Sequence, residues 1–240
     1  MWKNVSMVKT PLIIPDAPIT VTVGAIMPEM GAAIGCFFRK YISQRLQDNF
    51  MIYFSVISTT LGVQLLGRVS NLSAVVLTFL LGGLLGHALQ IDKRIGSLAK
   101  KGGNQQNQSA SSVILVAFTL FCASTSGILG ALDLGFSGDT TLLITKATMD
   151  FLAAVFFASA CGWSIAIIAV PLGIILGAFY LLSTQISPYL SEAMIGNFSA
   201  YGGFIQFLNA LRIIKLKDPP VLDLLPGMVL IFPITYFWSC

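Results

Sequence analysis

Two opposite charges lie inside an otherwise apolar stretch of the chain. Between Leu142 and Ile186 only Lys146 and Asp150 carry a charge. Their spacing of four residues places both on one face of a helix. Charges at membrane depth are costly and usually face a bundle interior or a water-filled path. The pair is therefore either a structural ion pair or part of a binding site, in which Asp150 holds a cation or proton and Lys146 neutralises it or attracts an anion.

Small and polar side chains in two other apolar segments are candidates for lining the same path. The segment FCASTSGILG carries hydroxyl residues beside a glycine, and a loop acid follows it: Ser124, Thr125, Ser126, Gly127 and Asp139. The segment NFSAYGGFIQFLNAL carries a hydroxyl, a glycine pair that offers bare backbone, and an amide: Ser199, Gly202, Gly203 and Asn209. Tight helix packing is the alternative for both segments, and a solvated loop residue is the alternative for Asp139.

Two further acidic residues lie within or beside apolar segments. Glu29 follows Pro28 about halfway along the first segment, so it is either buried with a partner or the segment has different bounds. Asp223 lies near the start of the last segment and precedes a Pro-Gly pair, which is typical of a kink. Its shallow position predicts that it lies at the membrane interface.

The composition predicts a membrane protein. The chain has 240 residues, a mean hydropathy of +0.84 and 10% charged residues, whereas a soluble domain carries about 25%. The lipid bilayer is therefore an expected partner. The net charge of +4 comes from bases in short loops, which favours membrane orientation over nucleic-acid binding. No Cys-x-x-Cys, histidine cluster or nucleotide-binding loop stands out, so neither a metal, a cofactor nor an enzymatic activity is expected.

Apolar runs of about 20 residues predict an all-α polytopic bundle with about eight transmembrane segments. The fifth and sixth form one run that must fold back near Gly162. A proline interrupts the first segment and a glycine pair the seventh, so either could be broken or re-entrant. The expected segments are 19–38, 49–67, 71–91, 111–132, 141–162, 164–186, 196–214 and 220–238.

Basic residues predict the orientation of these segments. With eight segments, the loops after the first, third and seventh share one side and hold ten of the fourteen Lys and Arg residues. The positive-inside rule makes that side cytoplasmic, so both termini are expected outside. Residues 1–18 are interpreted as an extramembrane arm and residues 19–238 as a single transmembrane domain, with a polar cytoplasmic loop at about 92–111.

Two hairpins of the chain resemble each other. NFMIYFSVISTTLGV before SNLSAVVLTFLLGGLLGHAL is similar to MDFLAAVFFASACGW before SIAIIAVPLGIILGAFYLL. ASTSG, before the second hairpin, is likewise similar to SAYGG, before the eighth segment. The charge rule puts the first turn outside and the second inside, so the copies are inverted. Inverted repeats recur in transporters and channels, whose sites lie near the midplane between the copies.

The residues around the charged pair resemble the YqgA family of bacterial inner-membrane proteins, over roughly residues 24–238. The family pattern FCAS-x-x-GI-x-G, then GMTGD, then a lysine and an aspartate four residues on, is similar to the stretch from FCASTSGILG to Lys146 and Asp150. The resemblance implies an inner-membrane, multi-pass protein. The family is often labelled as transport proteins, with no substrate attached. The chain departs from the family pattern at Gly24 (asparagine expected), Pro28-Glu29 (no counterpart), His87 (glutamate expected) and Asn197 (aspartate expected).

We therefore expect a transporter or channel for a small solute or ion, with Lys146 and Asp150 at its centre. The lack of a nucleotide-binding loop favours a secondary transporter or channel over an ATP-driven pump. Protonation of Asp150 could couple transport to a proton gradient, although Lys146 opposes it by stabilising the anion. The alternative is a structural or interaction protein that forms an oligomer such as a dimer through Gly-x-x-x-Gly faces: Gly31/Gly35, Gly82/Gly86 and Gly173/Gly177.

Overall fold

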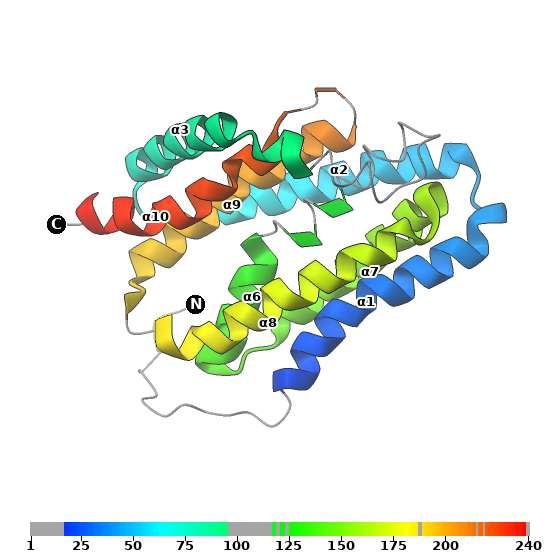
Figure 1. Cartoon of the computed structure of the whole chain (residues 1–240), viewed down its shortest axis with the longest axis horizontal. Helices are drawn as coiled ribbons and strands as arrows, with labels where there is room; N and C mark the ends of the chain where they lie inside the picture. Colours follow the sequence, from blue (N-terminus) through cyan, green and yellow to red (C-terminus); the bar gives the residue numbers. More distant parts are fainter. Residues whose placement is uncertain are drawn as a thin grey trace.

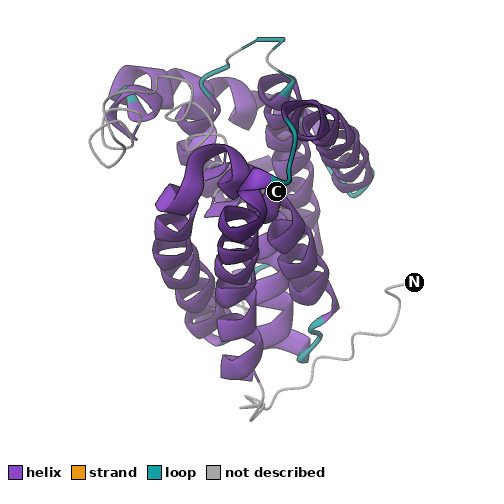
Figure 2. Ribbon diagram, turned by 90° about the vertical axis from the view of Figure 1, so that its right-hand side faces the viewer, coloured by secondary structure: helices purple, strands orange, loops and turns teal. Residues whose placement is uncertain are grey.

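A computed structural model describes residues 17–95, 117–118, 121–122, 125–186, 189–214, 216–217 and 219–238. All regular structure within these ranges is helical (Figure 2). Most of the expected N-terminal arm and most of the expected 92–111 loop lie outside them. The longer helices are α1 (Ala17–Phe37), α2 (Gln44–Leu66), α3 (Leu72–Leu89), α6 (Thr125–Ser137), α7 (Thr141–Cys161), α8 (Ala169–Ile186), α9 (Glu192–Ile213) and α10 (Leu225–Trp238). Short 3-10 helices are η1 (Phe38–Lys40), η2 (Gly162–Ile168) and η4 (Val221–Leu224).

Local sequence signals explain where several helices begin and end. Ser43, Asn71 and Ser191 precede α2, α3 and α9, and each side chain accepts a hydrogen bond from the backbone N–H three residues on. This is the usual role of Ser and Asn at a helix N-cap. Helix α7 ends at Gly162, whose φ of 71° is in the region that glycine tolerates. The fold-back predicted near Gly162 is therefore confirmed.

Several helices have the length and surface of membrane spans. Five in the described part of the chain are long and apolar enough to cross a bilayer, and two shorter apolar helices lie within α6 and α8. Large apolar side chains point outward; Leu84, Ile174 and Val229 are 67%, 67% and 72% exposed. In contrast, α9 is mostly buried within the molecule. The all-α prediction is confirmed, and the number of eight crossings stays a prediction.

The helices form two bundles (Figure 1). The first bundle consists of α1, α6, α7 and α8, and the second consists of α2, α3, α9 and α10. Two buried apolar clusters follow this division in part: the first draws mainly on α7, the second mainly on α9, and α6 contributes to both. The bundles meet where α2 contacts α7 and where α6 contacts α9. Any site between the bundles is therefore built from these four helices.

Glycines allow close backbone contact inside each bundle. In the first, α1 runs unbroken through Pro28, and a Cβ at Gly35 would lie 2.1 Å from the Val155 carbonyl oxygen of α7. In the second, α9 runs unbroken through its glycine pair, and a Cβ at Gly203 would lie 2.7 Å from the Gly62 carbonyl oxygen of α2. Both helices are continuous at these positions, because the glycines bring helices together instead of interrupting them. That each of them crosses the whole bilayer stays a prediction.

Candidate functional site

Lys146 and Asp150 form a buried ion pair on α7. The Lys146 Nζ donates hydrogen bonds to both carboxylate oxygens of Asp150. The two side chains are only 9% and 6% exposed. The Nζ also lies 5.7 Å from the ring centroid of Phe121, within the range of a cation–π interaction. The two residues are one helical turn apart, so each charge has its counter-charge beside it within an otherwise apolar stretch of sequence.

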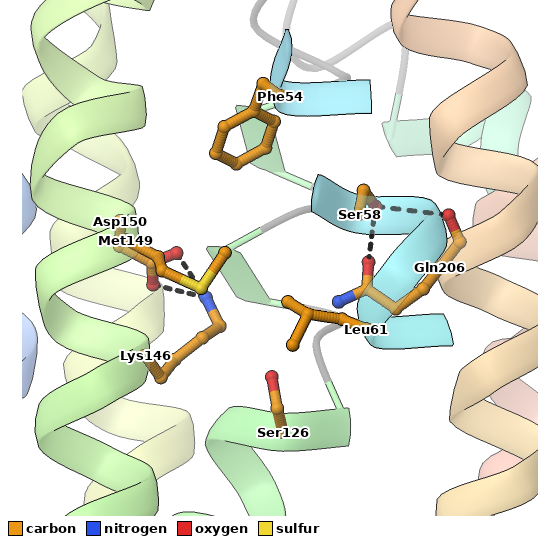
Figure 3. Close-up of a pocket in the computed structure, with 8 residues that line it drawn as sticks. All are labelled: Phe54, Ser58, Leu61, Ser126, Lys146, Met149, Asp150 and Gln206. Carbon is orange, nitrogen blue, oxygen red and sulfur yellow. Dashed lines mark hydrogen bonds and ion pairs between the residues drawn. The ribbon is translucent and has the colours of Figure 1, made fainter. Parts of the chain in front are cut away.

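The pair borders a small cavity between the two bundles (Figure 3). The space open to the centre of a water-sized sphere is about 20 Å³, which is enough for about one water molecule. The first bundle supplies residues from α6 and α7, and the second supplies residues from α2 and α9. The lining residues are Phe54, Ser58, Leu61, Ser126, Lys146, Met149, Asp150 and Gln206.

The wall opposite the ion pair is polar. The Ser58 hydroxyl of α2 lies 3.2 Å from the backbone oxygen of Gln206 and 3.3 Å from its side-chain Oε1, and donates to both. Gln206 is 5% exposed. Its side-chain nitrogen, Nε2, makes no hydrogen bond within the described residues and points toward the cavity (Figure 3). An amide and an ammonium thus face the same space from different bundles.

The structure brings together some of the predicted site residues. Ser126, Lys146 and Asp150 line the cavity. Gly127 adjoins them, since a Cβ on it would lie 3.9 Å from the Lys146 Cε. Ser124 and the side chain of Thr125 lie outside the described part of the chain.

The predicted residues on α9 do not line this cavity. Ser199 is buried, and its hydroxyl donates to the Ile195 carbonyl oxygen of its own helix at 2.8 Å. Gly202 is buried beside Gly203, whose backbone packs on α2. Asn209 is 1% exposed, and its Oδ1 has no hydrogen-bond partner within the described residues. Ser199 is therefore used within α9, and Gly203 in its contact with α2. Asn209 is a separate buried polar group.

Asp139 lies just before the first residue of α7. Its Oδ1 accepts a hydrogen bond from the Thr141 backbone N–H at 2.8 Å. The side-chain hydrogen bond from Thr141, followed by the backbone bond, holds the pKa of the exposed Asp139 carboxyl below its usual value. The geometry gives Asp139 a role in starting α7, about two turns of helix from Lys146.

Comparison with known proteins gives the chain a family. The sequence profile described as "Protein of unknown function (DUF554)" matches residues 19–236. The chain belongs to the DUF554 family. It is 31% identical over 218 residues to "Uncharacterized protein YqgA" of Escherichia coli (strain K12), covering 88% of this chain and 93% of that protein. It is 28% identical over 216 residues to "Uncharacterized membrane protein YdfK" of Bacillus subtilis (strain 168), with the same coverage. No solved structure matches the chain.

Membership of DUF554 confirms the resemblance read from the sequence and the assignment to multi-pass membrane proteins with bacterial homologues. It assigns no activity, because the names of both relatives record none. One departure from the expected pattern, Asn197, can be explained structurally. Its Oδ1 accepts hydrogen bonds from the backbone N–H groups of Ser70 and Asn71 at 3.0 and 2.8 Å, and its Nδ2 donates to Thr235 at 3.1 Å. Asn197 therefore ties the α2–α3 turn to α9 and α10.

A second polar cluster joins α3, α9 and η4 of this DUF554 protein. Arg212 contacts the carboxylate of Asp92 at 3.4 Å, and the Asp92 backbone N–H donates to Asp223 at 2.8 Å. The His87 Nδ1 lies 3.8 Å from the other Asp223 oxygen. Asp223 is thus buried and bonded within the protein, and its position at the depth of the membrane interface stays a prediction. Glu29 lies on an exposed face of α1, so the structure does not support the first of its two alternatives, burial with a partner.

Sequence reasoning missed the α2 contribution to the site. Phe54, Ser58 and Leu61 line the cavity from this helix, and α9 adds Gln206. One signal was available in the sequence, because Ser55, Ser58 and Gly62 recur at spacings of three and four residues. Such a stripe of small residues predicts a close helix contact. The structure puts α9 there, with the Ser55 hydroxyl donating to the Ala210 carbonyl oxygen at 3.0 Å.

Proposed function

We propose that this DUF554 protein is a secondary transporter or channel for a small solute or ion, with Lys146 and Asp150 at its binding site. The observation that carries the proposal is that the buried pair borders a cavity with polar groups from both bundles. An ion pair that only stabilised the fold would not need Ser58, Ser126 and Gln206 around an open space. Intramembrane charges that face such a space are characteristic of solute and ion paths.

We infer that the inverted repeat predicted from the sequence underlies this site. We infer one repeat from α2, α3 and the segment that ends in α6, and the other from α7, α8 and α9. The helix contacts support this assignment, since α6 packs on the α7–α8 hairpin and α9 packs on α2 and α3. The four helices that line the cavity are then two from each repeat. In transporters built this way, access alternates as one part moves against the other around a fixed site.

The orientation follows from the charges on the loops. We infer that the loop after α3 is cytoplasmic and that both termini are outside, because ten of the fourteen basic residues fall on one side of the eight proposed segments. Asp139, in the loop before α7, is then on the outer side. A solute that enters from outside would pass this carboxylate before it reached Lys146.

Glycine contacts bear on the alternative of an oligomer-forming structural protein. The first two Gly-x-x-x-Gly pairs are used within the chain: Cβ atoms at Gly31 and Gly86 would lie 2.3 and 1.7 Å from carbonyl oxygens of α7 and η4. Gly173 approaches Ala25 of α1, whereas Gly177 has nothing within 4 Å. Most of these glycines therefore support internal packing, which favours transport over an assembly role.

The test is solute flux through the purified protein in liposomes. Asp150→Asn and the double variant Lys146→Met/Asp150→Leu remove the charges, and Asp48→Asn makes the same chemical change at an exposed site of α2. With chloride, formate, nitrate, sodium and potassium gradients, we expect at least one flux in the wild type and in Asp48→Asn. The folded double variant should lose it. Unchanged flux in that variant, or no flux in any liposome, would reject the proposal.

A further inference from the structure

The polar groups that line the cavity differ in whether their hydrogen-bonding capacity is already used. Both carboxylate oxygens of Asp150 accept from Lys146, and the Oε1 of Gln206 accepts from Ser58. These three acceptor oxygens therefore already have donors. The Gln206 Nε2, in contrast, faces the cavity and makes no hydrogen bond within the described residues. A ligand in the cavity that accepts a hydrogen bond from this amide would be stabilised.

The charges around the cavity are also distributed unevenly. Figure 3 shows the Lys146 ammonium on the cavity side of the Asp150 carboxylate, with Gln206 across the space. Among the described residues, Lys146 is the titratable group that acts on Asp150, and the buried Cys122 thiol lies near both of them. The α2 and α9 walls contribute only neutral side chains. The cavity therefore presents a positive group and an N–H donor, and its negative charge lies behind the ammonium.

We propose that the solute is a small monovalent anion that binds between Lys146 and Gln206, and that Asp150 takes up a proton when it binds. This inference rests on the proposed transport function and names its substrate class. The bound anion replaces the Asp150 carboxylate as the partner of the ammonium. A buried carboxylate without a counter-charge is strongly unfavourable, so it takes a proton from the side where the anion enters. One anion and one proton bind together, and the net charge of the site does not change.

The size of the cavity limits the anion. A space of about 20 Å³ for sphere centres fits one species of about the size of water. Chloride and formate are the probes closest to this size, whereas gluconate is far too large. The apolar walls from Phe54, Leu61 and Met149 favour a weakly hydrated anion over a divalent one.

The decisive variant is Gln206→Glu, which keeps the shape of the side chain but replaces the N–H donor by an acidic oxygen. Gln64→Glu makes the same change on an exposed face of α2 and serves as the control. The first readout is the thermal midpoint of the full-length protein in detergent, with sodium chloride or formate compared with sodium gluconate. The second is proton uptake into liposomes on addition of chloride or formate, followed with an internal pH dye.

We expect chloride or formate to raise the midpoint and to carry protons inward in the wild type and in Gln64→Glu. In Gln206→Glu the apparent affinity should fall about tenfold or more, because a donor to a charged group is lost. An unchanged affinity would overturn the inference, since it would mean that the Oε1 of Gln206 faces the cavity and the Nε2 faces Ser58. Cation flux that depends on Asp150, with no effect of anions, would reject the anion and keep the transport function. No flux at all would reject both.

Discussion

The side chains of Lys146 and Gln206 line the same cavity although they belong to different bundles. Lys146 is fixed by its own helix, because its partner Asp150 is one turn away on α7. Gln206 is fixed by a neighbouring helix, through the Ser58 hydroxyl of α2. Each group is therefore held within its bundle, and the space between them depends on how the bundles fit together.

The ion pair should show strong coupling in stability. Lys146→Met or Asp150→Leu alone leaves one buried charge without a partner, which costs about 3–5 kcal/mol of folding free energy. The double variant removes both charges, so it should be more stable than either single variant. Thermal unfolding of the four proteins in the same detergent measures this cycle. If the losses simply added in the double variant, the two residues would not be coupled.

Two glycines at equivalent positions of Gly-x-x-x-Gly pairs should respond differently to alanine. A Cβ at Gly86 would lie 1.7 Å from the Asp223 carbonyl oxygen, whereas Gly177 has nothing within 4 Å. Gly86→Ala should force α3 away from η4 and cost at least about 2 kcal/mol, or prevent folding. Gly177→Ala should be neutral or slightly stabilising, because alanine has the higher helix propensity. Yield of monodisperse protein and thermal midpoint give the comparison; equal behaviour of both would contradict the packing described.

Asn197 should tolerate aspartate but not leucine. Aspartate keeps an acceptor for the backbone N–H groups of Ser70 and Asn71, and the Thr235 hydroxyl can donate to it. Leucine leaves those N–H groups without their acceptor in a buried setting, at about 1–3 kcal/mol each. Thermal unfolding should therefore place Asn197→Asp close to the wild type and Asn197→Leu well below it. The opposite order would show that the amide of Asn197 is needed for another reason.

Asp139 should stabilise the start of α7 in a pH-dependent way. The pKa of its carboxyl is lower in the folded protein than in an unfolded chain, because Thr141 donates to the charged form. The stabilisation is therefore complete above the ordinary pKa of about 4 and is lost as the pH falls through the lower folded value. For this exposed group the effect is less than about 1 kcal/mol. The difference in unfolding free energy between wild type and Asp139→Ala should vanish in acid; a constant difference would contradict this role.

The sequence predicts much of this fold because its signals are local. Apolar length and charge mark the helices, and a glycine marks the turn at Gly162. The spacing of Lys146 and Asp150 is also local, since one helix turn decides it. The polar wall that faces them is not local: Ser58 and Gln206 are 148 positions apart and meet only in the folded chain.

Glycine was the most ambiguous signal in the sequence. Gly203 reads equally well as a break in a helix, as bare backbone for a solute, or as a contact point. The structure selects the contact, because the backbone of Gly62 fills the position that a side chain would occupy. The position of Glu29 was ambiguous for a similar reason, since hydropathy does not tell which face of α1 is covered.

The aromatic contact between α2 and α7 has a consequence for how the molecule can move. The rings of Phe50 and Phe156 stack at 3.4 Å between centroids and 12° between planes, across the junction of the two bundles. Inside a bundle, glycines bring helix backbones into close contact. The junction between the bundles is made here by side chains, and helices packed through side chains can slide past one another in shear motions. Movement of the two bundles relative to each other should therefore begin at this contact between α2 and α7. Cysteine cross-links across it would arrest such a movement, whereas cross-links between α2 and α9 would not.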